Sequence, residues 1–475
     1  MIAATLVQQQ KGSVLVRYGP VSALIIASFF SADTPLFLFG VGVFIFFYYQ
    51  FLNLQAPPVI LFIFFFQWFF NQGQLILALI NGQVPLSSMF VPGESVKTVY
   101  YLGMIGSASF FLGVLYFYRK VPGQSLEQLR RFAYEINVDK MLLLYVASYL
   151  MQGTVASIAY LFPGLRQPLV MLLTFKWSLL VLLIVAVFVH RKHMFILFLL
   201  IGAEFVLGFA SFWASFKDVV YVAFIAYWIF YFRGSVLIRW TLPVIVAFMV
   251  YIGSIWTVIK QDYRDFLNSG TGLQTSLVTR EQALDKFTEL AKSTSDNDID
   301  KGFDDLILRM SWIGAFNKVY NHVPAKVPYS NGSLWTEGIT RPFMPRLLFP
   351  EKKSLSDSKE LNYYSGLHVD EENTSISLST IAGSYVDFGP VWMHLPLFLF
   401  GLFFGWVYRR IFRMASNFLL AHALSVPLIF IASINEQSIN RMVSSVVLYL
   451  AIVWFVCRFL QGPLLRFITN SGVRR

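Results

Sequence analysis

Residues 168–189 contain the uninterrupted apolar run Leu179-Leu-Val-Leu-Leu-Ile-Val-Ala-Val-Phe-Val189. An apolar segment of about 20 residues predicts a helix that crosses the hydrocarbon core of a bilayer, which is ~30 Å thick. Together with this one, twelve such segments can be found, so we predict an all-α polytopic membrane protein. They lie near residues 18–32, 35–54, 57–80, 98–118, 141–162, 168–189, 194–214, 218–232, 239–258, 391–408, 415–434 and 442–461.

The number of spans has alternatives. The segments at 18–32 and 218–232 are short, and the break at Ser31–Pro35 is also consistent with one re-entrant unit formed with the next segment. Eleven or thirteen spans are therefore the alternatives to twelve.

The composition excludes other classes. Of 475 residues, 56% are apolar and 13% are charged, whereas a soluble domain carries roughly a quarter charged residues. Disorder is excluded too, because it requires low hydrophobicity. A single cysteine, Cys457, excludes a disulfide framework and a cysteine-based zinc site.

The distribution of Lys and Arg predicts the orientation. If the amino terminus is cytoplasmic, the inner loops hold 18 of the 37 cations, and the short outer loops and outer helix ends hold five. Cytoplasmic loops are enriched in Lys and Arg, so this split places both termini in the cytoplasm. The net charge of +11 is thus explained by membrane topology, and we expect no nucleic-acid partner.

One long segment resembles a soluble protein. Residues 260–390 hold 14 Lys and Arg and 18 of the 26 Asp and Glu, and the charge bias places them outside the cytoplasm. We predict helices at Leu277–Ser293 and Asp300–Val323, the second capped by Asp298 or Asp300, because apolar residues recur there at helical spacing. The predicted organisation is an N-terminal membrane domain (1–258), a large extracytoplasmic loop (259–390) and a C-terminal membrane domain (391–475).

A proline-rich segment within this loop carries cations. Arg341-Pro-Phe-Met-Pro-Arg346-Leu-Leu-Phe-Pro350 is followed by Lys352 and Lys353, and its three prolines favour extended backbone over a regular helix. Arg matches phosphate oxygens bidentately, and Lys adds point charge. The segment indicates a phosphate site, with a surface loop paired to acids as the alternative.

The layout resembles a known family. Many apolar helices precede an outer loop with Pro345-Arg346-Leu-Leu-Phe-Pro350-Glu-Lys352, and Ser375-Ile-Ser-Leu-Ser-Thr-Ile-Ala-Gly383-Ser-Tyr385-Val-Asp-Phe388-Gly389 leads into the last helices. This resembles the Wzy-like oligosaccharide repeat-unit polymerases of O-antigen, capsule and exopolysaccharide pathways. An Arg-x10-Gly motif described for some members is absent, so those members' arginines are not carried over.

The resemblance implies a membrane glycosyltransferase of the bacterial inner membrane with an architecture similar to C-type membrane glycosyltransferases. A hydroxyl of one undecaprenyl-diphosphate-linked oligosaccharide would attack C1 of the reducing-end sugar of another, and undecaprenyl diphosphate would leave. Membrane lipid, a chain-length regulator and a flippase of the same pathway are the implied partners. No cofactor is expected.

Candidate catalytic residues follow from the needs of that reaction. Arg346 and Arg341 would stabilise the leaving diphosphate, and Arg441 would complete its site. Glu436 would act as the general base. An ordinary solvated turn in which Glu436 and Arg441 pair is the alternative. The candidate substrate-binding residues are Lys352, Lys353, Arg309, Arg264, His322 and Tyr385.

Other polar residues have plainer interpretations. Asp296-Asn-Asp298-Ile-Asp300 has poor spacing for a metal, and Asp is common at helix starts, so no metal is expected. Glu204, within an apolar segment, favours pairing with another helix, while Gly401 and Gly405 favour close helix packing. Trp335 and Trp392 suit either sugar stacking or membrane anchoring.

Rival functions remain. A ligase that moves finished glycan onto an acceptor would share the loop and its arginines. A lipid-linked oligosaccharide flippase or other transporter would require charges and broken helices near the midplane, where only Glu204 is plainly placed.

Overall fold

The computed structural model describes most of the chain. The described residues are 19, 21–52, 58–82, 95–122, 126–212, 215–231, 236–271, 276–344, 348–349, 351–352, 356–369, 376–433 and 437–469. All regular elements within these ranges are helices, and no β-strand occurs in them. The predicted all-α class is confirmed for this part of the chain.

Among the described residues, eight helical segments are long and apolar enough to cross a membrane. They are α2 (Thr34–Phe51), α3 (Val59–Ile80), α5 (Ser95–Tyr118), α7 (Val138–Leu161), α8 with α9 (Arg166–Leu173 and Phe175–His190), α12 (Val236–Leu267), α19 (His394–Met414), and α22 (Ile439–Phe455) continued through η3 (Val456–Leu460) into α23 (Gln461–Ile468). Each coincides with a segment predicted from hydropathy, so a membrane-embedded protein is confirmed.

The remaining predicted spans fall on shorter or only partly described helices. Segments 194–214, 218–232 and 415–434 correspond to α10 (Met194–Phe209), α11 (Phe216–Tyr231) and the pair α20 (Phe418–Ser425) and α21 (Leu428–Ala432). Segment 18–32 lies partly outside the described residues. The count of twelve spans stays a prediction.

Helices also fill the long central segment. They are α13 (Arg280–Ser293), α14 (Asp296–Arg309), α15 (Ile313–His322), α16 (Ser333–Thr340), the short η2 (Arg341–Phe343), α17 (Asp357–Ser365) and α18 (Thr380–Trp392). Outside this segment, α6 (Leu126–Glu135) precedes α7, and η1 (Pro163–Leu165) precedes α8.

The prediction of one helix over 300–323 was wrong. The chain forms α14 and α15 instead, because the Trp312 backbone N–H donates to the Phe70 carbonyl of α3, 3.2 Å away, and interrupts the helix. The predicted cap was also wrong. Ser295 caps α14, and Asp298 completes the capping box by accepting from the Ser295 backbone.

Helices α5 and α19 pack closely against each other. A Cβ atom added at Gly401 would lie 2.0 Å from the Phe110 carbonyl oxygen, and one at Gly405 would lie 2.7 Å from that of Val114. The same holds from the side of α5, because a Cβ atom added at Gly113 would lie 2.3 Å from the Phe398 carbonyl oxygen of α19. The predicted packing role of Gly401 and Gly405 is confirmed, because backbones approach this closely only without side chains.

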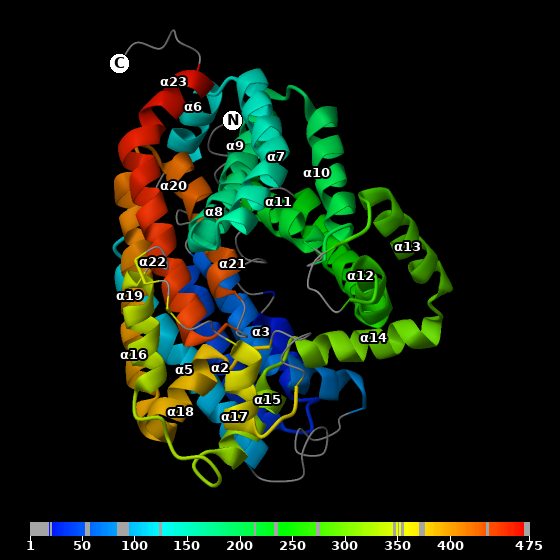
Figure 1. The fold of residues 1–475 in the computed structure, drawn as a ribbon, viewed down its shortest axis with the longest axis vertical. Helices are drawn as coiled ribbons and strands as arrows, with labels where there is room; N and C mark the ends of the chain where they lie inside the picture. Colours follow the sequence, from blue (N-terminus) through cyan, green and yellow to red (C-terminus); the bar gives the residue numbers. More distant parts are fainter. Residues whose placement is uncertain are drawn as a thin grey trace.

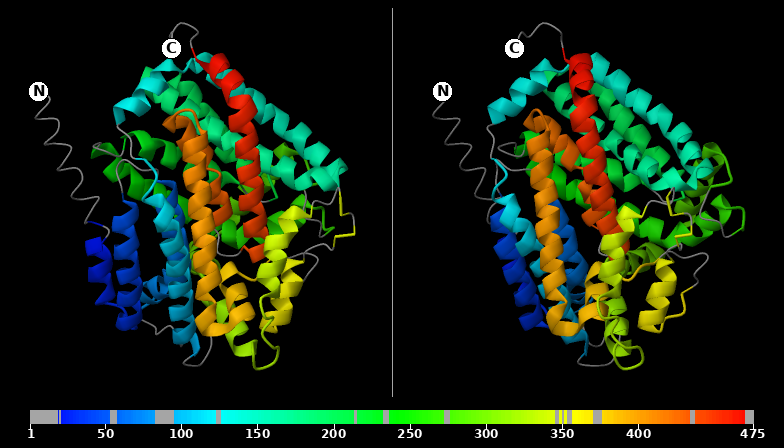
Figure 2. Two further views of the ribbon diagram at one scale, coloured as in Figure 1. Left: turned by 90° about the vertical axis from the view of Figure 1, so that its left-hand side faces the viewer. Right: turned by 60° about the vertical axis from the view of Figure 1, so that its left-hand side comes forward.

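Most of the described helices fall into two large groups and a smaller third part (Figure 1). One holds α2, α3, α5 and α19 with α15–α18 beside them, and the other holds α6–α11, α20 and α23. Helices α12–α14 form a third part, on the opposite side of Figure 1 from α16 and α22. Figure 2 shows α22 and its continuation running from α16 up to the end of the molecule that carries α6.

Candidate functional site

Asp387 of α18 holds the start of α16. Its side chain is buried, and its carboxylate accepts from Ser330 Oγ at 2.5 Å, Leu334 N at 3.1 Å and Trp335 N at 2.9 Å. The first amide groups of a helix lack intrahelical partners and favour a negative charge. Asp387 therefore fixes where α16 begins, and so where the residues further along α16 lie.

The end of α16 carries an ion pair. Arg341 Nη1 lies 2.7 Å from Glu337 Oε1, one helical turn away, and the Arg341 side chain is largely buried. Lys352 Nζ donates to the carbonyl oxygens of Arg341 and Met344 at 2.7 and 2.8 Å. The ammonium group of Lys352 thus holds the chain that follows against the end of η2, where the Met344 carbonyl lies past the last helical residue.

A second ion pair joins α17 to α22. The buried Asp357 carboxylate pairs with Arg441 and accepts from Ser438 Oγ at 3.1 Å. Ser438 also caps α22, because its Oγ accepts from the Arg441 backbone N–H. The start of α22 is thereby tied to the start of α17, and the Arg441 side chain keeps about half of its surface exposed at 52%.

Glu360 lies one turn after Asp357 on α17. Burial, together with the nearby carboxylates of Asp357, Glu337 and Asp387, raises the pKa of its carboxyl group to about 8. Glu337, Arg341, Asp357, Glu360, Asp387 and Arg441 form what we call the charged cluster, drawn from α16, α17, α18, η2 and α22.

The charged cluster combines two chemical capacities. A carboxyl group that titrates close to neutral pH can accept or return a proton, and raised carboxyl pKa values are frequent at functional sites. The guanidinium groups of Arg341 and Arg441, which pair with Glu337 and Asp357, supply positive charge for an anionic group. Among the described residues, no group of three His, Cys, Asp or Glu side chains is arranged to hold a metal ion.

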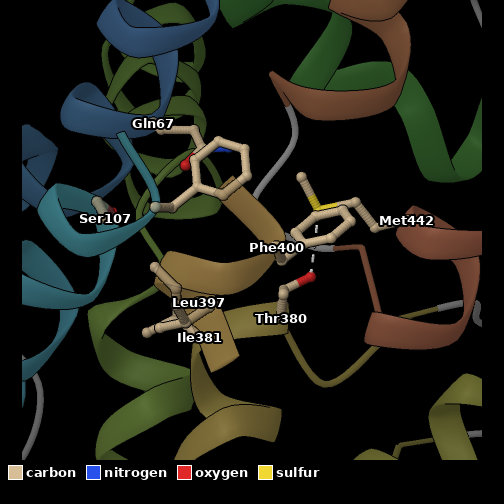
Figure 3. A pocket seen from close by; sticks show the side chains of 8 residues that line it. Gln67, Ser107, Thr380, Ile381, Leu397, Phe400 and Met442 are labelled. Carbon is tan, nitrogen blue, oxygen red and sulfur yellow. Dashed lines mark hydrogen bonds between the residues drawn. The ribbon is translucent and has the colours of Figure 1, made fainter. Parts of the chain in front are cut away.

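A small cavity lies next to this region, between α3, α5, α18, α19 and α22 (Figure 3). Its volume is about 20 Å³, which is room for about one water molecule and excludes a sugar. Thr380 Oγ1 borders it and donates to the Gln437 carbonyl at 2.8 Å and towards Met442 Sδ at 3.4 Å, the contact dashed in Figure 3. The cavity belongs to the packing beneath the charged cluster.

The structure brings together three of the residues predicted from sequence. Arg341, Arg441 and Lys352 all lie around the contact between α16, η2 and α22. Arg346, Lys353 and Glu436 lie outside the described residues, so their predicted roles stay predictions.

Arg264 and Arg309 lie elsewhere. The Arg264 guanidinium lies 4.9 Å from the centre of the Phe212 ring, and the charge of Arg309, which is exposed at the end of α14, acts on it. Both residues belong to α12 and α14, which Figure 1 places across the molecule from α16. They do not join the charged cluster.

The structure gives Tyr385 a packing position instead of the sugar contact predicted from sequence. Its ring is buried against Tyr320 and Tyr329, and its hydroxyl donates to the Val323 carbonyl at 2.8 Å, so neither is presented to a ligand. Trp335 is buried likewise, with Nε1 donating to Ser384. The structure gives both a packing role, while Trp392 is exposed.

His322 ends α15 and is half-buried. Its ring lies against Gly366, where an added Cβ atom would come within 2.9 Å of it. The ring is thus packed beside the turn that follows α17, and its predicted substrate contact stays a prediction.

Glu204 has the structural partners that its sequence position indicates. Lys176 Nζ lies 3.0 Å from Glu204 Oε2, and the Tyr145 hydroxyl donates to Glu204 Oε1 at 2.7 Å. The pair joins α7, α9 and α10. The predicted pairing is confirmed.

Comparison with protein families places this chain. A family model described as a domain of unknown function, DUF8712, matches residues 92–465. The chain belongs to the DUF8712 family. Searches of curated proteins and of solved structures gave no match. The DUF8712 match covers every residue of the charged cluster.

Sequence reasoning missed the acids of the charged cluster. Glu337, Asp357, Glu360 and Asp387 are four of the 18 acids in residues 260–390, and no local pattern separates them from the rest. Asp387 alone had a sequence signal, because it lies within residues 375–389, the stretch on which the family resemblance rests. Their mutual proximity distinguishes these four, and Asp357 and Asp387 are also buried. Both properties arise from the tertiary structure.

Proposed function

We propose that this DUF8712 protein polymerises undecaprenyl-diphosphate-linked oligosaccharides at the outer face of the bacterial inner membrane. The observation that carries the proposal is Glu360, a carboxyl group with a pKa of about 8 that lies near Glu337 and Asp357, the carboxylates that pair with Arg341 and Arg441. The resemblance to repeat-unit polymerases supplies the substrate class.

Glu360 is the proposed general base. A base is most effective when its pKa lies near the working pH, because it must be deprotonated yet hold a proton well. Deprotonated Glu360 would take the proton of the acceptor hydroxyl as the oxygen bonds to C1 of the donor sugar. The bond from C1 to the diphosphate oxygen breaks in the same step.

Arg441 and Arg341 are the proposed partners of the leaving diphosphate, together with Arg346, which follows Arg341 closely in the chain. Arg441 is more accessible than Arg341, since 52% of the Arg441 side chain is exposed against 11% of the Arg341 side chain. Charge-assisted hydrogen bonds to the departing oxygens stabilise the transition state.

The test uses a deletion strain that expresses Glu360→Gln, Arg441→Gln or Arg346→Ala. We expect normal protein levels in the membrane, a loss of polymer of at least tenfold, and accumulation of single lipid-linked repeats measured by mass spectrometry. Glu281→Gln on exposed α13 is the matched control and should keep the wild-type polymer.

Two results would contradict the proposal. Polymer of normal length in Glu360→Gln and Arg441→Gln would remove the charged cluster from the reaction. Long lipid-linked polymer that is never transferred to its final acceptor would identify a ligase instead.

A further inference from the structure

Five large apolar side chains stand exposed around the end of α16. They are Ile339, Phe343, Met344, Leu348 and Phe349, and between 37% and 71% of each is exposed. We call these five residues the apolar ridge. In water such a patch is costly, and contiguous exposed apolar surface marks a contact with a membrane or a partner.

The depth of the ridge follows from its contacts with two spanning helices. A Cβ atom at Gly338 would lie 2.7 Å from Ile439, the first residue of α22. The Trp335 ring centre lies 5.7 Å from that of Phe400, which is almost two turns inside α19. Helix α16 therefore lies at the level where one span starts and another has already begun (Figure 2).

The hydrogen bonds of the backbone carbonyl groups near the ridge also suit a position at the membrane. The Met344 carbonyl group lies past the end of η2 and has no helical continuation, and in lipid it would be costly if unpaired. Lys352 donates to it, and also to the Arg341 carbonyl group, which already accepts from the Met344 N–H. A Lys side chain can lie along apolar surface while its ammonium group reaches polar atoms, as at membrane interfaces.

We propose that the apolar ridge is inserted in the interfacial layer of the bilayer, where Ile339, Phe343 and Leu348 contact lipid chains. Lipid is the occupant because the ridge adjoins the ends of two spanning helices and is flanked by the cations Arg341 and Lys352, which favour phosphate headgroups.

Insertion of the apolar ridge would also set the depth of the charged cluster in the membrane. Glu337 and Arg341 belong to the same short helical segment as the ridge, so they would lie at the depth of lipid phosphates. An amphiphile could then present its phosphate to Arg441 without leaving the membrane. The insertion itself does not depend on the proposed polymerase activity.

The test measures depth directly. Single-cysteine variants Phe343→Cys and Leu348→Cys, in a Cys457→Ala background, are labelled with a nitroxide and reconstituted in lipid nanodiscs. Collision with oxygen, which is concentrated in lipid, is compared with collision with a water-soluble nickel chelate by electron paramagnetic resonance. Lys326→Cys, an exposed residue before α16, is the matched control.

We expect both ridge labels to be several-fold more accessible to oxygen than to the chelate, and the control label to show the reverse. Chelate accessibility at both ridge positions equal to that of the control would overturn the insertion. Protection from both reagents would also overturn it, because a protein surface would then cover the ridge. Polymerase activity has no bearing on either result.

Discussion

At the scale of single residues, Glu360 differs most from what its sequence neighbourhood suggests. It stands in a polar stretch, yet burial and three nearby acids raise the pKa of its carboxyl group to about 8 from an ordinary value of 4.5. Its proton therefore has consequences for stability as well as for the proposed reaction.

The pKa of Glu360 predicts how stability changes with pH. Between about pH 4.5 and 8 the folded protein retains a proton that the unfolded chain releases, so the free energy of unfolding should fall as the pH rises. Glu360→Gln should flatten this decline. Melting temperatures of purified protein at constant ionic strength measure it.

Glu281→Gln is the control for that experiment and should keep the wild-type slope. If Glu360→Gln and wild type lose stability in parallel from pH 5 to 8, the Glu360 carboxyl group titrates at its ordinary value.

The pair between Asp357 and Arg441 predicts a coupled effect. Arg441→Ala removes the ion-pair partner of the buried Asp357 carboxylate, which keeps its hydrogen bond from Ser438, and should cost about 1–3 kcal/mol of unfolding free energy. Adding Asp357→Asn removes the uncompensated charge and should restore part of the loss. Denaturation of the wild type, the two single variants and the double variant completes this double-mutant cycle. Purely additive losses of unfolding free energy would show that the two side chains are not coupled.

At the scale of elements, α16 depends on Asp387. Asp387→Ala removes the acceptor of three hydrogen bonds, so we expect a loss of about 2–4 kcal/mol in unfolding free energy. Asp387→Asn retains one acceptor oxygen and should cost less. Equal stability of the Ala variant and wild type would mean that α16 is held by its apolar contacts alone.

The contact between α5 and α19 predicts opposite results for two Gly→Ala substitutions. Gly401→Ala places a methyl group against the Phe110 backbone and should lower the melting temperature by several degrees. Gly202→Ala in α10 meets open space, and there Ala is favoured over Gly by roughly 0.5–1 kcal/mol. Thermal unfolding in detergent compares them, and a neutral Gly401→Ala would contradict the close approach.

The split between α14 and α15 shows where helical periodicity stops being informative. The apolar residues over 300–323 repeat at helical spacing, but a hydrogen bond from Trp312 to α3 competes with the continuing helix. Such a contact joins residues far apart in the chain, so no local pattern announces it.

At the scale of the whole molecule, the charge bias predicts which side each end faces. In a Cys457→Ala background, an impermeant thiol reagent applied to spheroplasts should modify Lys326→Cys and spare Ser471→Cys. The reason is the excess of Lys and Arg in the short loops predicted to be cytoplasmic. Permeabilised cells, in which both cysteines react, are the control, and the reverse pattern in spheroplasts would invert the topology.

The sequence by itself predicted the all-helical class that the described part of the chain shows and its place in a membrane, and it located the eight long apolar helices of that part to within several residues. Hydropathy is a sum over adjacent residues, so it can be read along the chain. It also pointed to Arg341, which lies in a proline-rich segment with several cations, and to Arg441, which lies in an outer loop where cations are few.

Only the tertiary structure decided which acids matter. Glu360 and Asp387 look like any other carboxylates of the loop until α16, α17, α18 and α22 meet around them. Desolvation and charge interactions depend on distance in space rather than on separation in sequence, so the shifted pKa of Glu360 and the anchoring role of Asp387 exist only in the assembled fold.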